Sequence, residues 1–200
     1  MTMPRRGFKT EANEHAREVR RELGLQLHDP LNPWVLAEHL CVPVMPLSAL
    51  QMDCPGDVVR LLGPNSGEFS AVTVFRGSSR IIVHNDGHAS ARQAANLAHE
   101  LGHALLMHQP APALDFMGCR DWNEMMESEA SWLGPALLIS DEAALHIARE
   151  ELSLAEAAAT YGVSEPLVRM RLNVTAAKRR LGIVPRKAAS PTRFARSRPA

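Results

Sequence analysis

Two histidines and a glutamate lie close together in the run His99-Glu100-Leu101-Gly102-His103. Residues 90–108 have the apolar pattern of a helix, with the serine at its start as the expected N-cap. Because each helical residue turns by about 100°, His99 and His103 fall on one face, one turn apart. Two imidazoles so placed can bind one metal ion, and Glu100 beside them can take a proton from a water molecule at that metal. The spacing therefore predicts a hydrolytic zinc centre.

The residues around this run support the same interpretation. They make the helix apolar on nearly every side, as a buried helix would be: Ala95, Leu97, Ala98, Leu101, Ala104 and Leu105. Burying two histidines and a glutamate without a partner would be costly. The alternative is that both histidines are core side chains bonded to the backbone while Glu100 is exposed. His108 lies about 180° from His99 around the helix, so we expect it at the surface or the helix end and not as a ligand.

A catalytic zinc ion usually takes three protein ligands, so a third ligand must be found. The candidates are Asp115, Asp121, Glu124, Glu127 and Glu129. A rigid element packed against the histidine helix is the best source, which selects the helix predicted over residues 122–139. Asp121 and Glu124 form a capping box at its start. Glu127 and Glu129 differ by about 200° around this helix, so only one of them can face the metal.

Glu127 is favoured over Glu129 because its face of the helix also carries small residues that permit a close approach: Ala130, Ser131 and Gly134. Ser131, one turn further on, is placed to hydrogen-bond a ligand histidine. The predicted metal ligands are therefore His99, His103 and Glu127, with Glu100 as the catalytic base.

The rest of the chain is predicted to form a mostly helical α+β fold with a small antiparallel sheet. Apolar periodicity and capping residues predict helices over residues 11–23, 33–40, 122–139 and 140–149, and one helical turn over 47–51. Short apolar runs predict an edge strand at 41–45, a short strand at 58–62, and a hairpin of strands at 69–75 and 80–84. These elements make one catalytic domain, residues 11–150, after a disordered segment of residues 1–10.

Residues 151–182 are predicted to form two short helices joined by a turn. Ser153 and Glu156 form a capping box, and Ser164 caps the second helix after a glycine-containing turn. The pair resembles a helix-turn-helix, in which DNA binding would use Arg169, Arg171, Lys178, Arg179 and Arg180. We favour the alternative, a helical appendage that packs on the catalytic domain through Leu167, Val168, Met170 and Leu172. The basic tail, residues 183–200, is expected to be disordered and solvated.

Composition argues against several other classes of protein. The net charge is zero, so nothing global points to nucleic acid or a membrane surface, and no apolar run approaches the length of a membrane span. The N-terminus lacks the apolar segment of a signal peptide, so we expect a cytoplasmic protein. The three cysteines, Cys41, Cys54 and Cys119, form no C-x-x-C pair, which indicates reduced thiols and no zinc–cysteine site.

The sequence resembles the ImmA/IrrE-type zinc metallopeptidases over residues 11–180. The matching stretches are residues 16–25, residues 33–40, the run from Ile82 to Leu106 around the two histidines, and residues 127–138. The resemblance implies a zincin-like metallopeptidase domain in which Glu127, the first glutamate of the last stretch, is the third zinc ligand. It also implies a protein substrate, namely a cytosolic transcriptional repressor of helix-turn-helix type.

Two other functions are kept as alternatives. The chain could be a transcriptional regulator that binds DNA through residues 153–180 and uses zinc only to hold its fold or to sense metal. It could also be a protein-binding module whose metal site is inactive. A Glu100→Gln variant that retains zinc and loses proteolysis would favour the peptidase over both. No oxyanion stabiliser stands out, and the candidates are Tyr161, His146 and Arg149.

Overall fold

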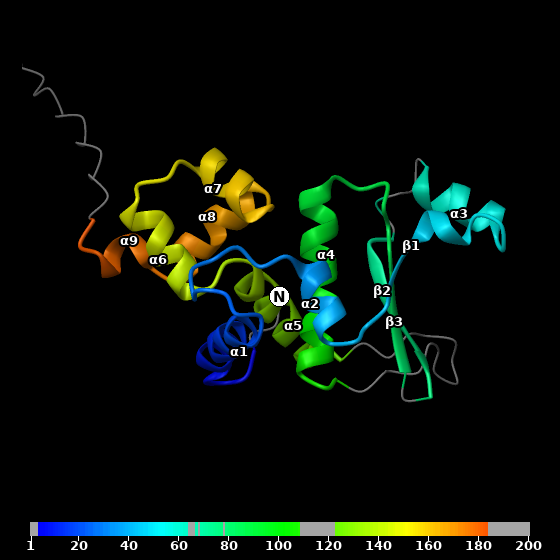
Figure 1. The fold of residues 1–200 in the computed structure, drawn as a ribbon, viewed down its shortest axis with the longest axis horizontal. Coiled ribbons are helices and arrows are strands. Elements are labelled where there is room, and N and C mark those ends of the chain that lie inside the picture. The colour runs from blue at the N-terminus through cyan, green and yellow to red at the C-terminus, as the bar shows by residue number, and fades with distance from the viewer. Residues whose placement is uncertain (1–3, 64–66, 68, 78, 109–122, 184–200) are drawn as a thin grey trace, which may run out of the picture.

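The structure is a computed structural model that describes residues 4–63, 67, 69–77, 79–108 and 123–183. A small sheet stands at one end and helices make up the rest (Figure 1), so the predicted α+β class is confirmed. The helices are α1 Phe8–Glu22, α2 Pro33–His39, the 3-10 helix η1 Leu47–Leu50, α3 Pro55–Leu62, α4 Ser90–Leu105, α5 Glu124–Leu138, α6 Asp141–Arg149, α7 Leu154–Tyr161, α8 Glu165–Val174 and α9 Ala177–Arg180. The strands are β1 Val44–Pro46, β2 Ala71–Arg76 and β3 Ser79–His84. In the described part of the chain no helix is both long and apolar enough to cross a membrane.

The sheet has the strand order β1-β3-β2 and is mixed. The predicted hairpin is present, since β2 and β3 are antiparallel with Thr73 opposite Ile82. However, β1 runs parallel to β3, with Val44 opposite Ile82, so the prediction of a purely antiparallel sheet was wrong. The reason is that η1, α3 and β2 lie between the two strands, and this long connection lets the chain return in the same direction. Both β1 and β2 are edge strands within the described sheet.

The short strand predicted at residues 58–62 is instead part of helix α3. Pro55 occupies the first turn, where its fixed φ favours a helix. Val58, Leu61 and Leu62 have helical spacing and pack in one cluster with residues of η1 and β3. A short apolar run fits either a strand or a helix, and here its contacts with neighbouring elements decide for the helix.

Three helix starts also differ from the predictions. Helix α1 begins at Phe8, within the segment expected to be disordered, because the Phe8 ring is fully buried in the core. Helix α4 has Ala89 as its N-cap, and Ser90, the expected cap, is its first residue. Helix α5 is capped by Asn123, whose side chain accepts hydrogen bonds from the backbone N–H groups of Met125 and Met126. The predicted capping-box partner Asp121 lies outside the described residues.

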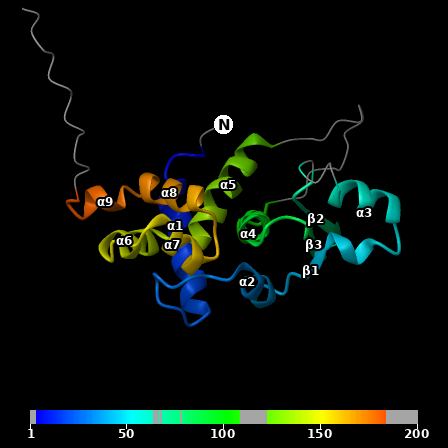
Figure 2. The same cartoon turned by 90° about the horizontal axis from the view of Figure 1, so that it is seen from above.

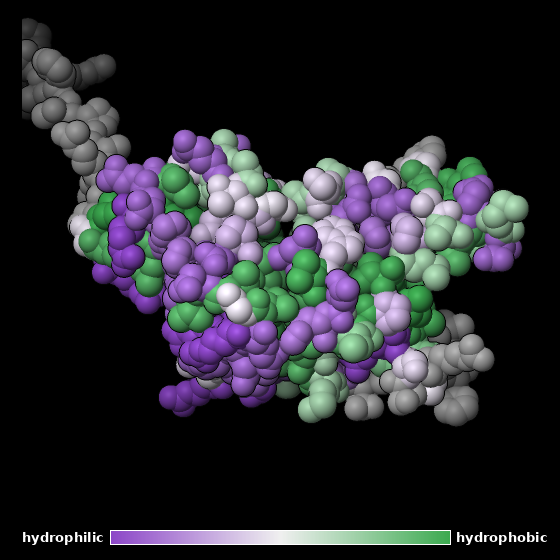
Figure 3. Space-filling view, in the orientation of Figure 1, coloured by the Kyte–Doolittle hydropathy of each residue, from purple (hydrophilic) through white to green (hydrophobic). Residues whose placement is uncertain are grey.

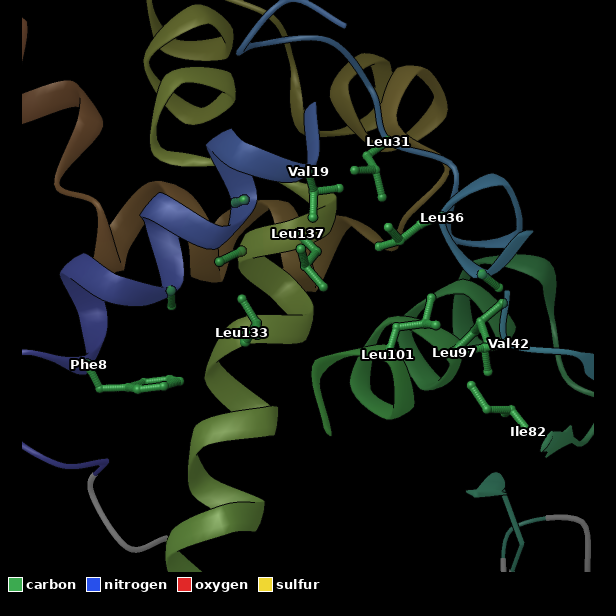
Figure 4. Close-up of a cluster of buried hydrophobic side chains, with 14 residues drawn as sticks. Phe8, Val19, Leu31, Leu36, Val42, Ile82, Leu97, Leu101, Leu133 and Leu137 are labelled. Atoms are coloured by element: carbon green, nitrogen blue, oxygen red, sulfur yellow. The ribbon is translucent and has the colours of Figure 1, made fainter. Parts of the chain in front are cut away.

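Helix α4 is the central element of the fold. It lies between the sheet on one side and α5 on the other, and Figure 2 shows the same arrangement from above. Figure 4 shows the cluster that joins these layers, with side chains from α1, α2, α4, α5 and β3: Phe8, Val19, Leu36, Ile82, Leu97, Leu101, Leu133 and Leu137. The other face of α1 is polar and contributes to the hydrophilic area at the lower left of Figure 3. Because α4 is held from both sides, side chains on it have defined positions.

The C-terminal helices share a second core cluster with α4, α5 and α6. Its members include Ala98, Leu138, Ile139, Ile147, Tyr161, Val168 and Leu172. The capping box of α7, the glycine-containing turn and the Ser164 cap of α8 are as predicted. Of the predicted packing residues, Val168 and Leu172 are buried whereas Met170 is exposed. Arg171 points inward: its Nε donates to the carbonyl of Ile139 at 2.8 Å, and the side chain is 3% exposed. An arginine bonded in this way is not available to contact DNA.

Candidate metal centre

The two histidines of α4 meet a glutamate of α5. The Nε2 atoms of His99 and His103 are 3.1 Å apart, as expected for residues one helical turn apart. Glu127 places Oε2 3.3 Å from His99 Nε2 and Oε1 3.7 Å from His103 Nε2. One donor atom from each of the three side chains lies within 4.8 Å of the others. Two imidazoles and one carboxylate form a donor set that suits zinc and leaves a position for water.

Close packing of α4 and α5 lets Glu127 reach the histidines. A Cβ atom at Gly134 would lie 3.0 Å from the backbone N of His99 and 3.1 Å from its Cα, closer than carbon atoms normally approach. At Gly102, on the facing side of α4, a Cβ would have room, since its nearest neighbour would be the carbonyl O of Ala130 at 3.5 Å. Gly134 therefore brings the two helix backbones into contact, and the small face predicted for α5 does lie against α4.

The electrostatics of this group favour an ionised carboxylate. Hydrogen bonds from His103 and His99 hold the pKa of Glu127 well below its usual range, although burial acts in the opposite direction. A carboxylate must be ionised to bind a metal ion. The side chains of His99, His103 and Glu127 are 27%, 19% and 26% exposed, so the group is open to a ligand from solvent.

Glu100 follows His99 on α4 and points toward the sheet. Its Oε2 accepts a hydrogen bond from the Thr73 hydroxyl at 2.5 Å. Thr73 lies in the middle of β2, the edge strand next to α4. Thr73 was not among the predicted site residues. Its place within the predicted strand 69–75 could be read from the sequence, but that place does not show which helical residue the Thr73 side chain contacts.

His108 lies only in part where it was predicted to lie. Its side chain is 8% exposed, and its Nδ1 lies 2.9 Å from Nδ1 of His103. His108 is therefore not at the surface, although it follows the end of α4 and is not among the three candidate ligands, as predicted. The prediction of a surface position extended the helix to residue 108, whereas α4 ends at Leu105 and Met107 adopts a positive φ of 50°. The chain therefore turns back, and His108 lies against the helix it has just left.

Glu129 does not face the pair of His99 and His103, in agreement with the choice of Glu127 as the candidate ligand. It is buried, its Oε1 accepts a hydrogen bond from Arg5 Nε at 2.6 Å, and its Oε2 lies 3.4 Å from His108 Nε2. Burial and the neighbouring His103 lower the pKa of His108, and Glu129 partly offsets this effect. Ser131, predicted to bond a ligand histidine, makes no such bond in the described part of the structure.

Two of the three candidates for an oxyanion stabiliser, Tyr161 and His146, have other contacts. The Tyr161 hydroxyl donates to the carbonyl of His28 at 2.8 Å. The His146 ring packs on the His28 ring with 4.5 Å between centroids. Among the described contacts, neither side chain is bonded to the three candidate ligands. Asp115 and Cys119 lie outside the described residues.

The site can now be set beside known proteins. A peptidase family model, described as the IrrE N-terminal-like domain, matches residues 57–173, more than half of the chain. The chain belongs to this family. The matched region of this IrrE-type peptidase runs from α3 into α8, so it contains Glu100 and all three candidate ligands. It also contains α7 and nearly all of α8, which pack in the second core cluster with α4, α5 and α6. A search of curated proteins found no match.

Membership of the family supports a metallopeptidase and therefore a protein substrate. The group of His99, His103 and Glu127 is compatible with the metal ion that such an enzyme needs. The resemblance inferred from the sequence is therefore confirmed at the level of the family.

Proposed function

We propose that this chain is a zinc-dependent endopeptidase that cleaves a helix-turn-helix transcriptional repressor in the cytoplasm. The observation that carries the enzymatic part is the convergence of two imidazole Nε2 atoms and one carboxylate beside a glutamate on the same helix. Stress response and transcription regulation are the cellular roles that such a substrate implies.

In this proposal His99, His103 and Glu127 hold the zinc ion. A zinc ion held there supplies a Lewis acid that polarises the scissile carbonyl and lowers the pKa of a water molecule toward about 7. Glu100 is the general base: it takes a proton from the water and passes it to the leaving amine. Thr73 fixes the position of the Glu100 carboxylate through its 2.5 Å hydrogen bond.

Strand β2 is the proposed docking edge for the substrate backbone. In the described sheet it pairs on one side only, with β3, and it also carries Thr73 beside the base. An extended peptide can add to such an edge by main-chain hydrogen bonds. A folded helix cannot, so the cleaved segment of the repressor must be a loop, a linker or a locally unfolded stretch.

The test is cleavage of candidate repressors followed by mass spectrometry. The purified chain with zinc is incubated with helix-turn-helix repressors encoded near its own gene, with and without a chelator. We expect one repressor to be cut at a single extended segment, with no cut in chelator or in the Glu100→Gln variant. If every repressor stays intact while the chain retards DNA through residues 153–180, a DNA-binding regulator replaces the proposal.

A further inference from the structure

A row of polar side chains continues from the metal group to the N-terminal segment. His103 contacts His108 through their Nδ1 atoms at 2.9 Å, and His108 Nε2 lies 3.4 Å from Glu129 Oε2. The other oxygen of Glu129 accepts from Arg5 Nε at 2.6 Å. The two middle members of the row are buried, with His108 and Glu129 side chains 8% and 9% exposed, whereas the His103 side chain is 19% exposed. Buried polar atoms keep such pairings because the unpaired alternative is costly.

The protons of this row can be assigned in only one way if His103 binds a metal. The Nε2 atoms of His99 and His103 converge on Glu127, so Nε2 is the ligand atom and must carry no proton. The remaining proton of a neutral His103 then sits on Nδ1 and donates to Nδ1 of His108.

His108 must in turn carry its own proton on Nε2, where it faces the carboxylate of Glu129. Glu129 accepts this N–H with one oxygen and the Arg5 N–H with the other. Along the row, the N–H groups of Arg5 Nε, His108 Nε2 and His103 Nδ1 each meet one acceptor, and Arg5 Nη2 donates outside the row to Glu11. A ligand histidine whose second nitrogen donates to a buried acceptor is held in one tautomer and one ring orientation.

We propose that His108 and Glu129, anchored by Arg5, are positioning residues that hold His103 in the tautomer and orientation needed to bind the metal. This inference rests on the metal-binding part of the proposed function and not on its peptidase part. Helix α5 then contributes to the site in two ways. Glu127 binds the metal directly, and Glu129, two residues later, supports His103 of α4 through His108.

The decisive variants are His108→Leu and His108→Gln. Leucine removes the acceptor for His103, whereas the glutamine amide offers an oxygen to His103 and an N–H to Glu129. Zinc affinity is measured by competition with a chelator, and cobalt(II) absorption of the substituted protein reports ligand geometry. We expect zinc affinity to fall by about 10–100-fold in His108→Leu and to be largely restored in His108→Gln.

A matched control exists on the surface. His39 Nε2 and Glu22 Oε2 form a similar pair at 2.9 Å that is remote from the metal group in sequence and largely exposed. We expect His39→Leu to leave zinc affinity and the cobalt spectrum unchanged. His108→Leu could instead lower the unfolding temperature of the metal-free protein and leave zinc affinity and the cobalt spectrum unchanged. In that case His108 has only a structural role, and the inference is overturned.

Glu129→Gln keeps the test decisive if His108→Leu does not fold. This variant keeps the shape of Glu129 but removes the charge that orients His108, so zinc affinity should fall several-fold, and less than in Glu127→Ala. Wild-type affinity in Glu129→Gln overturns the inference. If the affinities follow these expectations and no peptide is ever cleaved, the positioning role stands and the peptidase proposal alone fails.

Discussion

Replacing Gly134 by alanine tests whether the contact between α4 and α5 positions the metal group. The added Cβ would lie 3.0, 3.1 and 3.2 Å from His99 N, His99 Cα and Ala98 C, all of them backbone atoms. Carbon contacts are favourable at about 3.5–4.0 Å, so α5 would have to move by about 0.5 Å. Overpacking of this kind costs about 1–3 kcal/mol, and alanine returns up to about 1 kcal/mol through its higher helix propensity.

Gly102→Ala provides the matched control, because it places a Cβ on the facing helix at an ordinary 3.5 Å from Ala130 O. Both changes gain the same helix propensity, so the difference between the two variants isolates the overpacking cost. We expect Gly134→Ala to be less stable than Gly102→Ala by about 1–3 kcal/mol.

The free energies of unfolding are measured in urea with a chelator, and zinc affinities are measured separately. Zinc should bind Gly134→Ala more weakly, because the displaced backbone is that of His99 and the displaced helix carries Glu127. If Gly134→Ala is as stable as Gly102→Ala and binds zinc as wild type does, the close contact does not position the ligands.

Three further outcomes are expected. Thr73→Val should lower kcat for peptide hydrolysis while zinc affinity stays at the wild-type value, because the hydroxyl contacts Glu100 and none of the candidate ligands; unchanged kcat would contradict this role. Arg171→Met should lower the free energy of unfolding by about 2–3 kcal/mol, measured in urea, because the carbonyl of Ile139 loses a buried charged donor. In chelator, Glu127→Gln should be less stable than wild type near pH 5. Because the folded-state pKa of Glu127 lies below its usual value of 4.5, this difference should shrink as the pH falls below 4.5, and a difference that grows there would contradict the assigned direction.

Features set by neighbours in sequence were predictable. The histidine helix, the cap Ser164 and the capping box of α7 follow from local spacing and side-chain type. The cap and the capping box lie where they were predicted, and the histidine helix differs from its prediction at its two ends. The position of Glu127 beside the histidines also agrees with its prediction from the small residues on its face, although its role as a ligand stays a prediction.

Features set by distant contacts were not predictable. Nothing in residues 41–45 shows that β1 will run parallel to a strand more than thirty residues later. The inward direction of the Arg171 side chain depends on the carbonyl of Ile139, the residue that follows the last residue of α5. His108 was misplaced because helical periodicity was extended past the true end of α4, where Met107 reverses the chain.

The most direct test of the central claim measures proteolysis and bound zinc together in the Glu100→Gln variant. The amide cannot accept a proton, whereas His99, His103 and Glu127 are unchanged, so we expect stoichiometric zinc, wild-type stability and no cleavage of the repressor that the wild-type chain cuts. Cleavage near the wild-type rate would show that Glu100 is not the base. Loss of zinc from this variant would show that Glu100 belongs to the metal-binding group.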